Sequence, residues 1–305
     1  MVNRIVSLIP SGTEIVAALG YGDRLVGRSH ECDYPLHVGT LPICTSPKFD
    51  KDASSIEIDR SVRGLVENAL SVYKVHDDTL KQLNPDVIVT QSQCDICAVS
   101  RSDVEASVAS VLDGQATIAA MEAVDLAGLW ADILCVGNAL EVDARPLVDQ
   151  LTDRLSRARR ETGSEPPRVA CLEWLDPLMS AGNWVPELIQ MAGGVDIFSA
   201  PGSHSGVITW EAIVEADPDI IILMPCGYDL ARTSEEIPLL TRLNKYGSLR
   251  AVRENEIYVT EGNHYFNRPG PRLVDSLEIL VEILHADERV KFGMEGNAWE
   301  RASRP

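Results

Sequence analysis

The stretch Asn84-Pro85-Asp86-Val87-Ile88-Val89-Thr90 has a counterpart in Asp217-Pro218-Asp219-Ile220-Ile221-Ile222-Leu223, and together they decide the fold. In each stretch a Pro-Asp pair ends a helical pattern, at residues 77–83 and 211–216, and opens an apolar run. Short apolar runs of this kind are typical of strands buried on both faces of a parallel sheet. One such unit in each half of the chain predicts two similar α/β lobes.

Further strands and helices alternate around these two stretches. Arg4–Ile9 reads as a strand, followed by a helix over Glu14–Leu19 with Ser11 and Glu14 spaced as a capping box. In the second half, the strand Val169–Leu172 precedes a helix over Pro186–Met191. Strands that alternate with helices favour parallel pairing, so each lobe is expected to be Rossmann-like with a parallel sheet.

A long amphipathic helix is expected between the lobes. Asp143 can cap its start, and an apolar stripe follows at Leu147, Leu151, Leu155 and Ala158. The alternative is an ordinary surface helix inside one domain. The resulting division is an N-terminal lobe 1–142, a connecting helix 143–163, a C-terminal lobe 164–285 and a tail 286–305.

Charge and hydropathy exclude several kinds of partner. The formal net charge of −19 repels phosphate backbones, so no nucleic-acid partner is expected. No apolar run reaches the length of a membrane span, so no membrane insertion is expected. The first residues do not read as a leader, and the seven cysteines are an odd number that argues against a disulfide framework. We therefore expect a cytoplasmic protein, or an extracytoplasmic one if a leader was removed.

Aromatic residues gather in the loops that follow the predicted strands. Ligands of open α/β sheets bind outside the carboxyl ends of the strands, so these loops predict the ligand site. Large aromatics there suit a bulky, flat and partly apolar ligand held in the cleft between the lobes. Alternatively, some of them cap the core of a lobe. The predicted ligand-binding residues are Tyr34, Trp174, Trp184, His264, Tyr265, Phe266 and Arg268.

The chain also resembles the ABC-transporter substrate-binding proteins whose lobes are joined by one long helix, and among them the cobalamin-binding proteins. An ordered set of motifs carries the resemblance as far as about His285. The set is Arg4–Leu8, Pro10–Glu14, Cys32–Pro35, Gly182–Glu187, Ala192–Gly194, Trp210-Glu211 and Tyr265–Arg272.

The resemblance implies a non-enzymatic protein that captures cobalamin or a related corrinoid and has an ABC importer as its partner. It places Tyr34, Trp184, Tyr265, Phe266 and Arg268 against the corrinoid. The aromatic rings would pack on the macrocycle, and Arg268 would bind an amide or phosphate of the ligand.

Several cysteines follow the strands of the predicted N-terminal lobe. Cys32 comes after the second strand, Cys94 and Cys97 form a C-x-x-C pair after Val87–Thr90, and Cys44 is a fourth candidate. Thiolates that meet at strand ends suit zinc, an iron–sulfur cluster, or soft axial ligation of a bound cobalt. A redox pair and separate core residues remain the alternatives.

No motif of a common enzyme class is present. The sequence lacks a Gly-x-Ser-x-Gly elbow, a phosphate loop and a His-Glu-x-x-His helix. Two functions remain. The first is a non-enzymatic binder of a corrinoid or a similar bulky metal chelate, and the alternative is a metal or iron–sulfur protein that uses the N-lobe cysteines.

Overall fold

A computed structural model describes residues 2–67, 72–92, 116–285 and 291–302, together with 105, 106, 108 and 109. The chain divides into two compact units, unit 1 (Met1–Leu151) and unit 2 (Thr152–Pro305). Within the described ranges, no helix combines the length and the apolar character that crossing a bilayer would require.

Unit 1 is built on a four-stranded sheet of order β2-β1-β5-β6, in which every neighbouring pair is parallel. A separate antiparallel pair, β3 with β4, lies outside this sheet. The elements are β1 Ile5–Ser7, α1 Pro10–Ala18, β2 Leu25–Arg28, β3 Thr45–Pro47, α2 Ser55–Glu67, β4 Tyr73–Val75, α3 Asp77–Leu83, β5 Val87–Gln91, β6 Thr117–Met121 and α5 Leu126–Ala139.

Unit 2 has a larger, mixed sheet of order β10-β8-β7-β11-β12-β13, with β9 also paired to β7. Its central strands β7, β11 and β12 are parallel. The elements are β7 Arg168–Leu175, β8 Leu178–Ser180, α7 Val185–Met191, β9 Val195–Asp196, β10 Gly206–Val207, α8 Trp210–Ala216, β11 Ile220–Leu223, α9 Leu230–Thr241, α10 Arg250–Arg253, β12 Ile257–Thr260, α11 Leu273–Leu284 and β13 Trp299–Arg301.

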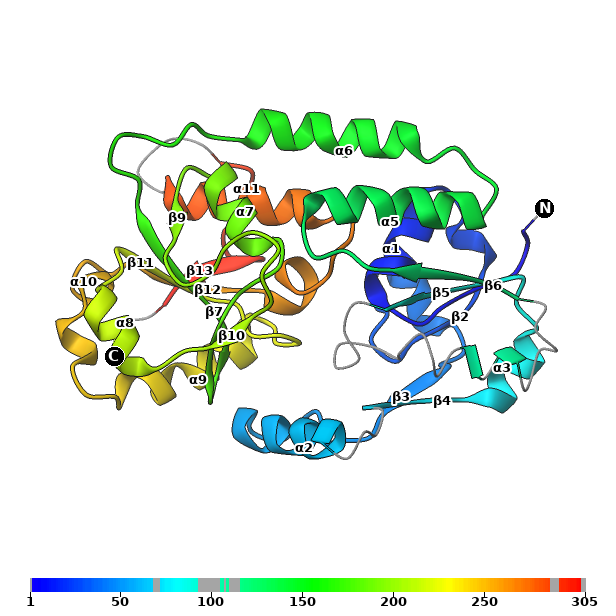
Figure 1. Cartoon of the computed structure of the whole chain (residues 1–305), viewed down its shortest axis with the longest axis horizontal. Coiled ribbons are helices and arrows are strands. Elements are labelled where there is room, and N and C mark those ends of the chain that lie inside the picture. The colour runs from blue at the N-terminus through cyan, green and yellow to red at the C-terminus, as the bar shows by residue number, and fades with distance from the viewer. Residues whose placement is uncertain are drawn as a thin grey trace. The chain divides into compact units, whose positions relative to one another are not determined.

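Helices cover the sheet of each unit. In unit 1, α1 and α5 pack against each other, and α5 also packs on β6 (Figure 1). In unit 2, α7 and α11 lie on one face of the sheet and α8, α9 and α10 on the other (Figure 1). Each unit has its own apolar core, which includes Val6 and Ile88 in unit 1 and Leu172 and Ile221 in unit 2. The prediction of two α/β units with parallel strands is confirmed.

The two Pro-Asp turns adopt the same local structure. α3 ends at Asn84, whose backbone is left-handed (φ 41°), and α8 ends at Asp217 in the same conformation (φ 43°). Asparagine and aspartate tolerate this region better than other residues with a side chain. Each helix therefore turns sharply into the strand that follows it.

An arginine and an aspartate tie each turn to the neighbouring strand. In unit 1, the Asp86 carboxylate accepts the Arg4 backbone N–H (3.0 Å), and the Arg4 side chain donates to Leu83 O (2.7 Å). In unit 2, the Asp219 carboxylate accepts the Arg168 N–H (2.8 Å), and the Arg168 side chain donates to Ala216 O (2.7 Å). The start of β1 and the start of β7 are thus fixed in the same way.

The first helix differs from its predicted form. α1 begins at Pro10, four residues before the predicted start, and no side chain caps it. Proline at the first helical position needs no hydrogen-bond acceptor for its nitrogen, so the predicted Ser11 cap is not used.

The predicted long helix is shorter in the structure. It is α6, Arg145–Ala158, and the division between the two units falls inside it, after Leu151. The Arg160 side chain donates to Ala158 O (2.7 Å) and Arg159 O (3.0 Å). These bonds satisfy carbonyls at the end of the helix, and the Arg160 N–H donates to Met191 O instead of continuing the helix. That α6 connects two lobes stays a prediction.

The structure differs from the expected separate tail over 286–305. β13 pairs antiparallel with β12, so Trp299–Arg301 belongs to the sheet of unit 2. The buried Glu282 carboxylate on α11 accepts the Gly293 N–H (2.7 Å) and the Trp299 indole N–H (2.7 Å). The charged and glycine-rich composition of this segment gives no sign of a strand. The strand is held in place by the buried Glu282 carboxylate, a contact that no local pattern of the sequence shows.

A buried carboxylate joins α5 to the end of β6. Asp132 accepts the backbone N–H groups of Glu122 and Ala123, each at 2.9 Å. Burial raises the pKa of Asp132 to about 6, and the two hydrogen bonds only partly oppose this effect. Because the ionised form is disfavoured in the folded state, Asp132 favours folding below its ordinary pKa of 3.8, and this contribution is lost as the pH rises through about 6.

We therefore expect the Asp132→Asn variant to lose part of the pH dependence of stability. Between pH 4 and pH 6, the free energy of unfolding of the wild type should fall by on the order of 2 kcal/mol more than that of the variant. Urea denaturation across this range measures the difference. Asp149→Asn, which removes an exposed carboxyl group, is the control, and equal slopes for the wild type and Asp132→Asn would refute the assignment.

Candidate functional site

In unit 2, two aromatic rings meet at the carboxyl ends of neighbouring strands. Trp174 lies near the end of β7, and Tyr228 lies in the loop after β11, with ring centroids 5.3 Å apart. The Trp174 indole donates to Asp176 O (3.1 Å), and the Arg232 guanidinium lies 5.0 Å from the Tyr228 ring. Trp174 was expected in a long loop, but β7 and β8 instead form an antiparallel pair there.

The segment after β12 packs tightly against this loop. Residues Gly262–Phe266 form a π-helical turn. A Cβ on Gly262 would lie 2.4 Å from Pro225 O, and the Asn263 N–H donates to Tyr228 O (3.1 Å). Only glycine allows this approach. The turn that carries His264 and Tyr265 is thereby fixed beside the aromatic pair.

His264 and Tyr265 are partly exposed on this turn. The His264 Nδ1 lies 3.3 Å from Glu261 Oε1, and the Glu261 carboxylate also accepts the His264 backbone N–H (3.3 Å). Burial raises the pKa of Glu261, and the neighbouring His264 opposes that shift. The Arg272 guanidinium lies 5.5 Å from the centroid of the Tyr265 ring. His264 and Tyr265 are therefore each oriented by a charged neighbour, Glu261 and Arg272 respectively.

Three other predicted ligand-binding residues are buried and hold this turn together. Trp184 is only 5% exposed, and its indole donates to Phe266 O (2.8 Å). Phe266 is fully buried. Arg268 is also buried and donates to Asn263 Oδ1 (3.0 Å). The structure therefore gives these side chains packing and hydrogen-bonding roles within unit 2, and their contact with a ligand stays a prediction.

In unit 1, the loop after β2 presents apolar surface. Tyr34 is 46% exposed, and Leu36, two residues later, is 88% exposed. The Tyr34 ring follows the carboxyl end of β2, where the strand order predicts a ligand-facing position. Sequence analysis identified Tyr34 but not Leu36.

The two described cysteines of the predicted metal set are buried in different surroundings. Cys32 Sγ accepts the Thr13 hydroxyl (3.0 Å) and lies 3.1 Å from Ser29 Oγ. Cys44 belongs to the apolar core, and burial raises the pKa of its thiol to about 12. Cys94 and Cys97 lie outside the described residues. In the part of the chain that is described, no group of three or more metal-ligating side chains comes together.

His30, two residues before Cys32 in the chain, is held as a neutral imidazole. Its Nδ1 lies 2.8 Å from Thr45 Oγ1, and burial lowers the pKa of the ring to about 4. The hydroxyl of Thr45 and the ring of Tyr73, 5.4 Å away, fix its orientation. His30 thus has a structural role at the β3–β4 pair.

Tyr228 is a buried residue of the candidate site that sequence analysis missed. Its loop, Pro225–Asp229, follows a predicted strand, so its position was available from the sequence. Its pairing with Trp174 depends on the adjacency of β7 and β11, which only the sheet order reveals.

We expect Trp184→Phe to lower the free energy of unfolding by about 1–3 kcal/mol, because the Phe266 carbonyl loses a buried hydrogen bond. Trp174→Phe should cost less, since Trp174 is partly exposed. Urea denaturation of both variants tests this. Unchanged stability together with weaker ligand binding in Trp184→Phe would instead identify Trp184 as a ligand contact.

Alkylation rates should separate the cysteines. At pH 8, the thiolate fraction of Cys44 is expected to be on the order of a thousandfold below that of an ordinary thiol, because its pKa is about 12. Cys32 should also react slowly because it is buried, whereas Cys226 is exposed and should react first. Peptide mass spectrometry after iodoacetamide treatment measures each rate. Equal labelling of Cys44 and Cys226 would contradict this order.

Comparisons with known proteins identify the family. A family model described as periplasmic binding protein matches residues 5–263. The chain is 23% identical over 293 residues to an uncharacterized ABC transporter substrate-binding lipoprotein, YvrC, of Bacillus subtilis (strain 168), which covers 93% of this chain and 80% of the relative.

Solved structures show the same fold. The periplasmic heme-binding protein RhuT of Roseiflexus sp. RS-1 matches with a TM-score of 0.68 and 20% identity, covering 94% of this chain and all of that one (100%). The periplasmic vitamin B12 binding protein BtuF of Vibrio cholerae matches with a TM-score of 0.59 and 19% identity, covering 94% of this chain and 98% of that one.

The expected cytoplasmic location is wrong. The matching family is periplasmic, the relative from Bacillus subtilis is a lipoprotein, and the two solved relatives are periplasmic. The thiols misled the prediction because Cys32, Cys44 and Cys171 are buried and form no disulfide. Buried thiols of this kind need no reducing compartment to stay unpaired.

The family match extends over most of the chain, and the two α/β units agree with the solved relatives in fold. Members of this family bind a substrate and do not transform it. The chain therefore belongs to the periplasmic binding protein family and is a substrate-binding protein, not an enzyme.

Proposed function

We propose that the protein is the substrate-binding component of an ABC importer and captures a bulky, flat metal chelate, a corrinoid or another tetrapyrrole. The carrying observation is that an aromatic ring with accessible surface lies at the carboxyl end of a strand in each unit. These rings are Tyr34 in unit 1 and, in unit 2, Trp174, which packs against the buried Tyr228. That the ligand is held between two lobes stays a prediction from the sequence.

The chemistry of these surfaces favours a macrocycle over a small polar solute. Aromatic faces bind flat apolar ligands by stacking, and Leu36 adds exposed apolar area beside Tyr34. A sugar or amino acid would leave this area uncovered.

The Gly262–Phe266 turn of unit 2 carries a nitrogen ligand for a bound metal. The His264 imidazole is partly exposed, and Glu261 fixes it through its Nδ1. Imidazole binds both cobalt and iron. We assign His264 the role of contacting the metal or the ring edge of the ligand.

The relatives support this ligand class. The importer partner is inferred from the lipoprotein of Bacillus subtilis, which is named as an ABC transporter substrate-binding protein. Two solved relatives of the same fold are named as heme-binding and vitamin B12 binding proteins. A corrinoid is our first choice because the motifs in the sequence resemble those of cobalamin-binding proteins.

Absorbance titration of the purified protein with cyanocobalamin and with haem tests the proposal. We expect a red complex with shifted corrin bands, and a shifted Soret band with haem alone would reassign the ligand within the tetrapyrrole class. If neither compound binds, the proposed function is wrong.

The Tyr34→Ala variant should weaken this binding about tenfold or more, as expected for an aromatic contact. Tyr21→Ala is the matched control. Tyr21 belongs to the same unit but follows the C-terminal end of α1, whereas the carboxyl end of β1 leads into the N-terminal end of that helix. Equal affinity of the two variants would remove Tyr34 from the site.

A further inference from the structure

Glu173, the residue before Trp174 in β7, interrupts the regular pairing of its strand. Leu172 pairs with Ser180 of β8 and Trp174 pairs with Met179, so β7 advances by two residues where β8 advances by one. Glu173 is thus the extra residue of a β-bulge. Bulges change the direction in which a side chain points, and they are common beside binding sites. The Glu173 side chain therefore need not follow the alternation of its strand.

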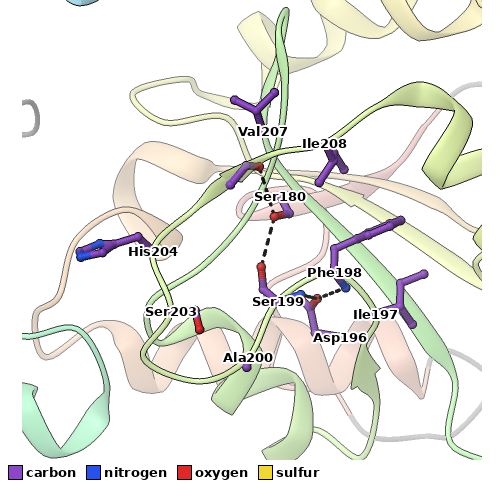
Figure 2. A pocket seen from close by; sticks show the side chains of 11 residues that line it. Ser180, Asp196, Ile197, Phe198, Ser199, Ala200, Ser203, His204, Val207 and Ile208 are labelled. Carbon is purple, nitrogen blue, oxygen red and sulfur yellow. Dashed lines mark hydrogen bonds between the residues drawn. The ribbon is translucent and has the colours of Figure 1, made fainter.

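The loop between β9 and β10 runs close to β8 and has a fixed beginning. Asp196 Oδ1 accepts the backbone N–H groups of Phe198 and Ser199, each at 2.9 Å (Figure 2). The Ser199 hydroxyl lies 3.1 Å from the hydroxyl of Ser180 in β8 (Figure 2). The first residues of the loop are therefore attached to the sheet by bonds that do not involve Glu173.

The end of the same loop depends on Glu173. The Ser205 hydroxyl donates to Glu173 Oε1 (2.8 Å), and the Glu173 carboxylate also accepts the Gly182 backbone N–H. A Cβ on Gly182 would lie 2.5 Å from Ser203 O and from Ser205 N, so the loop backbone passes directly over this glycine. The Asn183 N–H donates to Ser203 O (2.5 Å). One carboxylate thus joins the end of the loop to the segment after β8.

The backbone of Glu173 holds a second loop. Its carbonyl accepts the Cys226 N–H (3.1 Å), which attaches the loop Pro225–Asp229 after β11 to β7. This loop carries Tyr228, whose ring packs against Trp174. Both loops are therefore anchored one residue away from Trp174, which keeps accessible surface.

A carboxylate is a costly side chain for this position. Burial raises the pKa of Glu173, and the hydrogen bonds from Ser205 and from the Gly182 N–H oppose that shift. An apolar side chain in the bulge would avoid the desolvation cost, but it would take this acceptor away from the two donors. The carboxylate is therefore explained by the segments that it holds and not by packing alone.

We propose that Glu173 is a positioning residue of the ligand surface in unit 2. It holds the end of the β9–β10 loop and the loop after β11 beside Trp174, so that the indole presents a fixed face to the ligand. This role rests on the proposed function, because it assigns Trp174 to the tetrapyrrole site. A surface that is ordered before binding loses less conformational entropy when a ligand stacks on it. Tetrapyrrole affinity thus depends on a carboxylate that need not touch the ligand.

Three variants separate this role from a general loss of structure. Glu173→Ala removes the carboxylate, and Ser205→Ala removes only the hydroxyl that the carboxylate holds. Glu173→Gln keeps an amide that can accept the Gly182 N–H and donate to the Ser205 hydroxyl, so it should restore the wild-type behaviour. Glu211→Ala is the matched control, because it removes an exposed carboxylate from the same unit.

Amide hydrogen exchange without ligand measures the order of the loop. The Gly202 N–H donates to Asn183 O (2.9 Å), so its exchange requires the loop to open. In Glu173→Ala and in Ser205→Ala this amide should exchange about tenfold faster than in the wild type, because local opening becomes easier. Glu173→Gln and Glu211→Ala should exchange at the wild-type rate. Unchanged exchange in Glu173→Ala would overturn the proposal.

Absorbance titration with cyanocobalamin, or with haem if the wild type binds haem instead, measures the effect on the ligand. Affinity should fall about tenfold in Glu173→Ala and in Ser205→Ala, and the double variant should lose no more, because both changes remove one contact. Glu173→Gln and Glu211→Ala should bind like the wild type. Normal affinity in Glu173→Ala, or losses that add in the double variant, would refute the role of Glu173.

The two proposals fail in different ways. A wild type that binds neither compound would refute the proposed function. A wild type that binds, together with normal loop exchange and normal affinity in Glu173→Ala, would refute only the role of Glu173. If Glu173→Ala does not fold, Ser205→Ala decides, since it leaves the carboxylate and its bond to the Gly182 N–H in place.

Discussion

The hydrogen bonds between an aspartate after a left-handed turn and the start of a neighbouring strand are the constraint on which both units depend. Asp86 holds the Arg4 N–H in unit 1, and Asp219 holds the Arg168 N–H in unit 2. Each arginine side chain also bonds a carbonyl at the end of the helix before the turn. One device therefore fixes where a helix stops and where two parallel strands begin, and the carboxyl ends of those strands come to lie at one edge of the sheet.

The alignment of strand ends explains how the candidate site in unit 2 is built. Because β7 and β11 are neighbours in register, Trp174 and Tyr228 meet although they are far apart in the chain. The turn after β12 completes this surface, and Gly262 lets it approach the Pro225 carbonyl. Behind the surface, the buried indole of Trp184 holds the Phe266 carbonyl. The partly exposed Trp174 and the turn that carries His264 are thus supported by buried aromatic rings, and this division of roles suits a protein that binds a large ligand on a rigid surface.

Buried carboxylates recur at the ends of strands and in the loops beside them. Asp132 joins α5 to the segment after β6, and Asp196 organises the loop after β9. Burial raises the pKa of both to about 6. Asp132 has a hydrogen bond to each oxygen, whereas Asp196 has one oxygen without a normal one.

The sequence alone determined the two α/β units, because local signals such as the Pro-Asp turns and the apolar strands each act over a few residues. It also placed the aromatic loops, since strand ends can be read from the same pattern. Only the tertiary structure decided which aromatics are exposed: Tyr34 and Trp174 keep accessible surface, whereas Trp184 and Phe266 are buried. It also revealed β13, which the polar composition of its segment concealed until Glu282 was seen to anchor it. Burial and strand pairing depend on residues distant in the chain, and no local pattern contains that information.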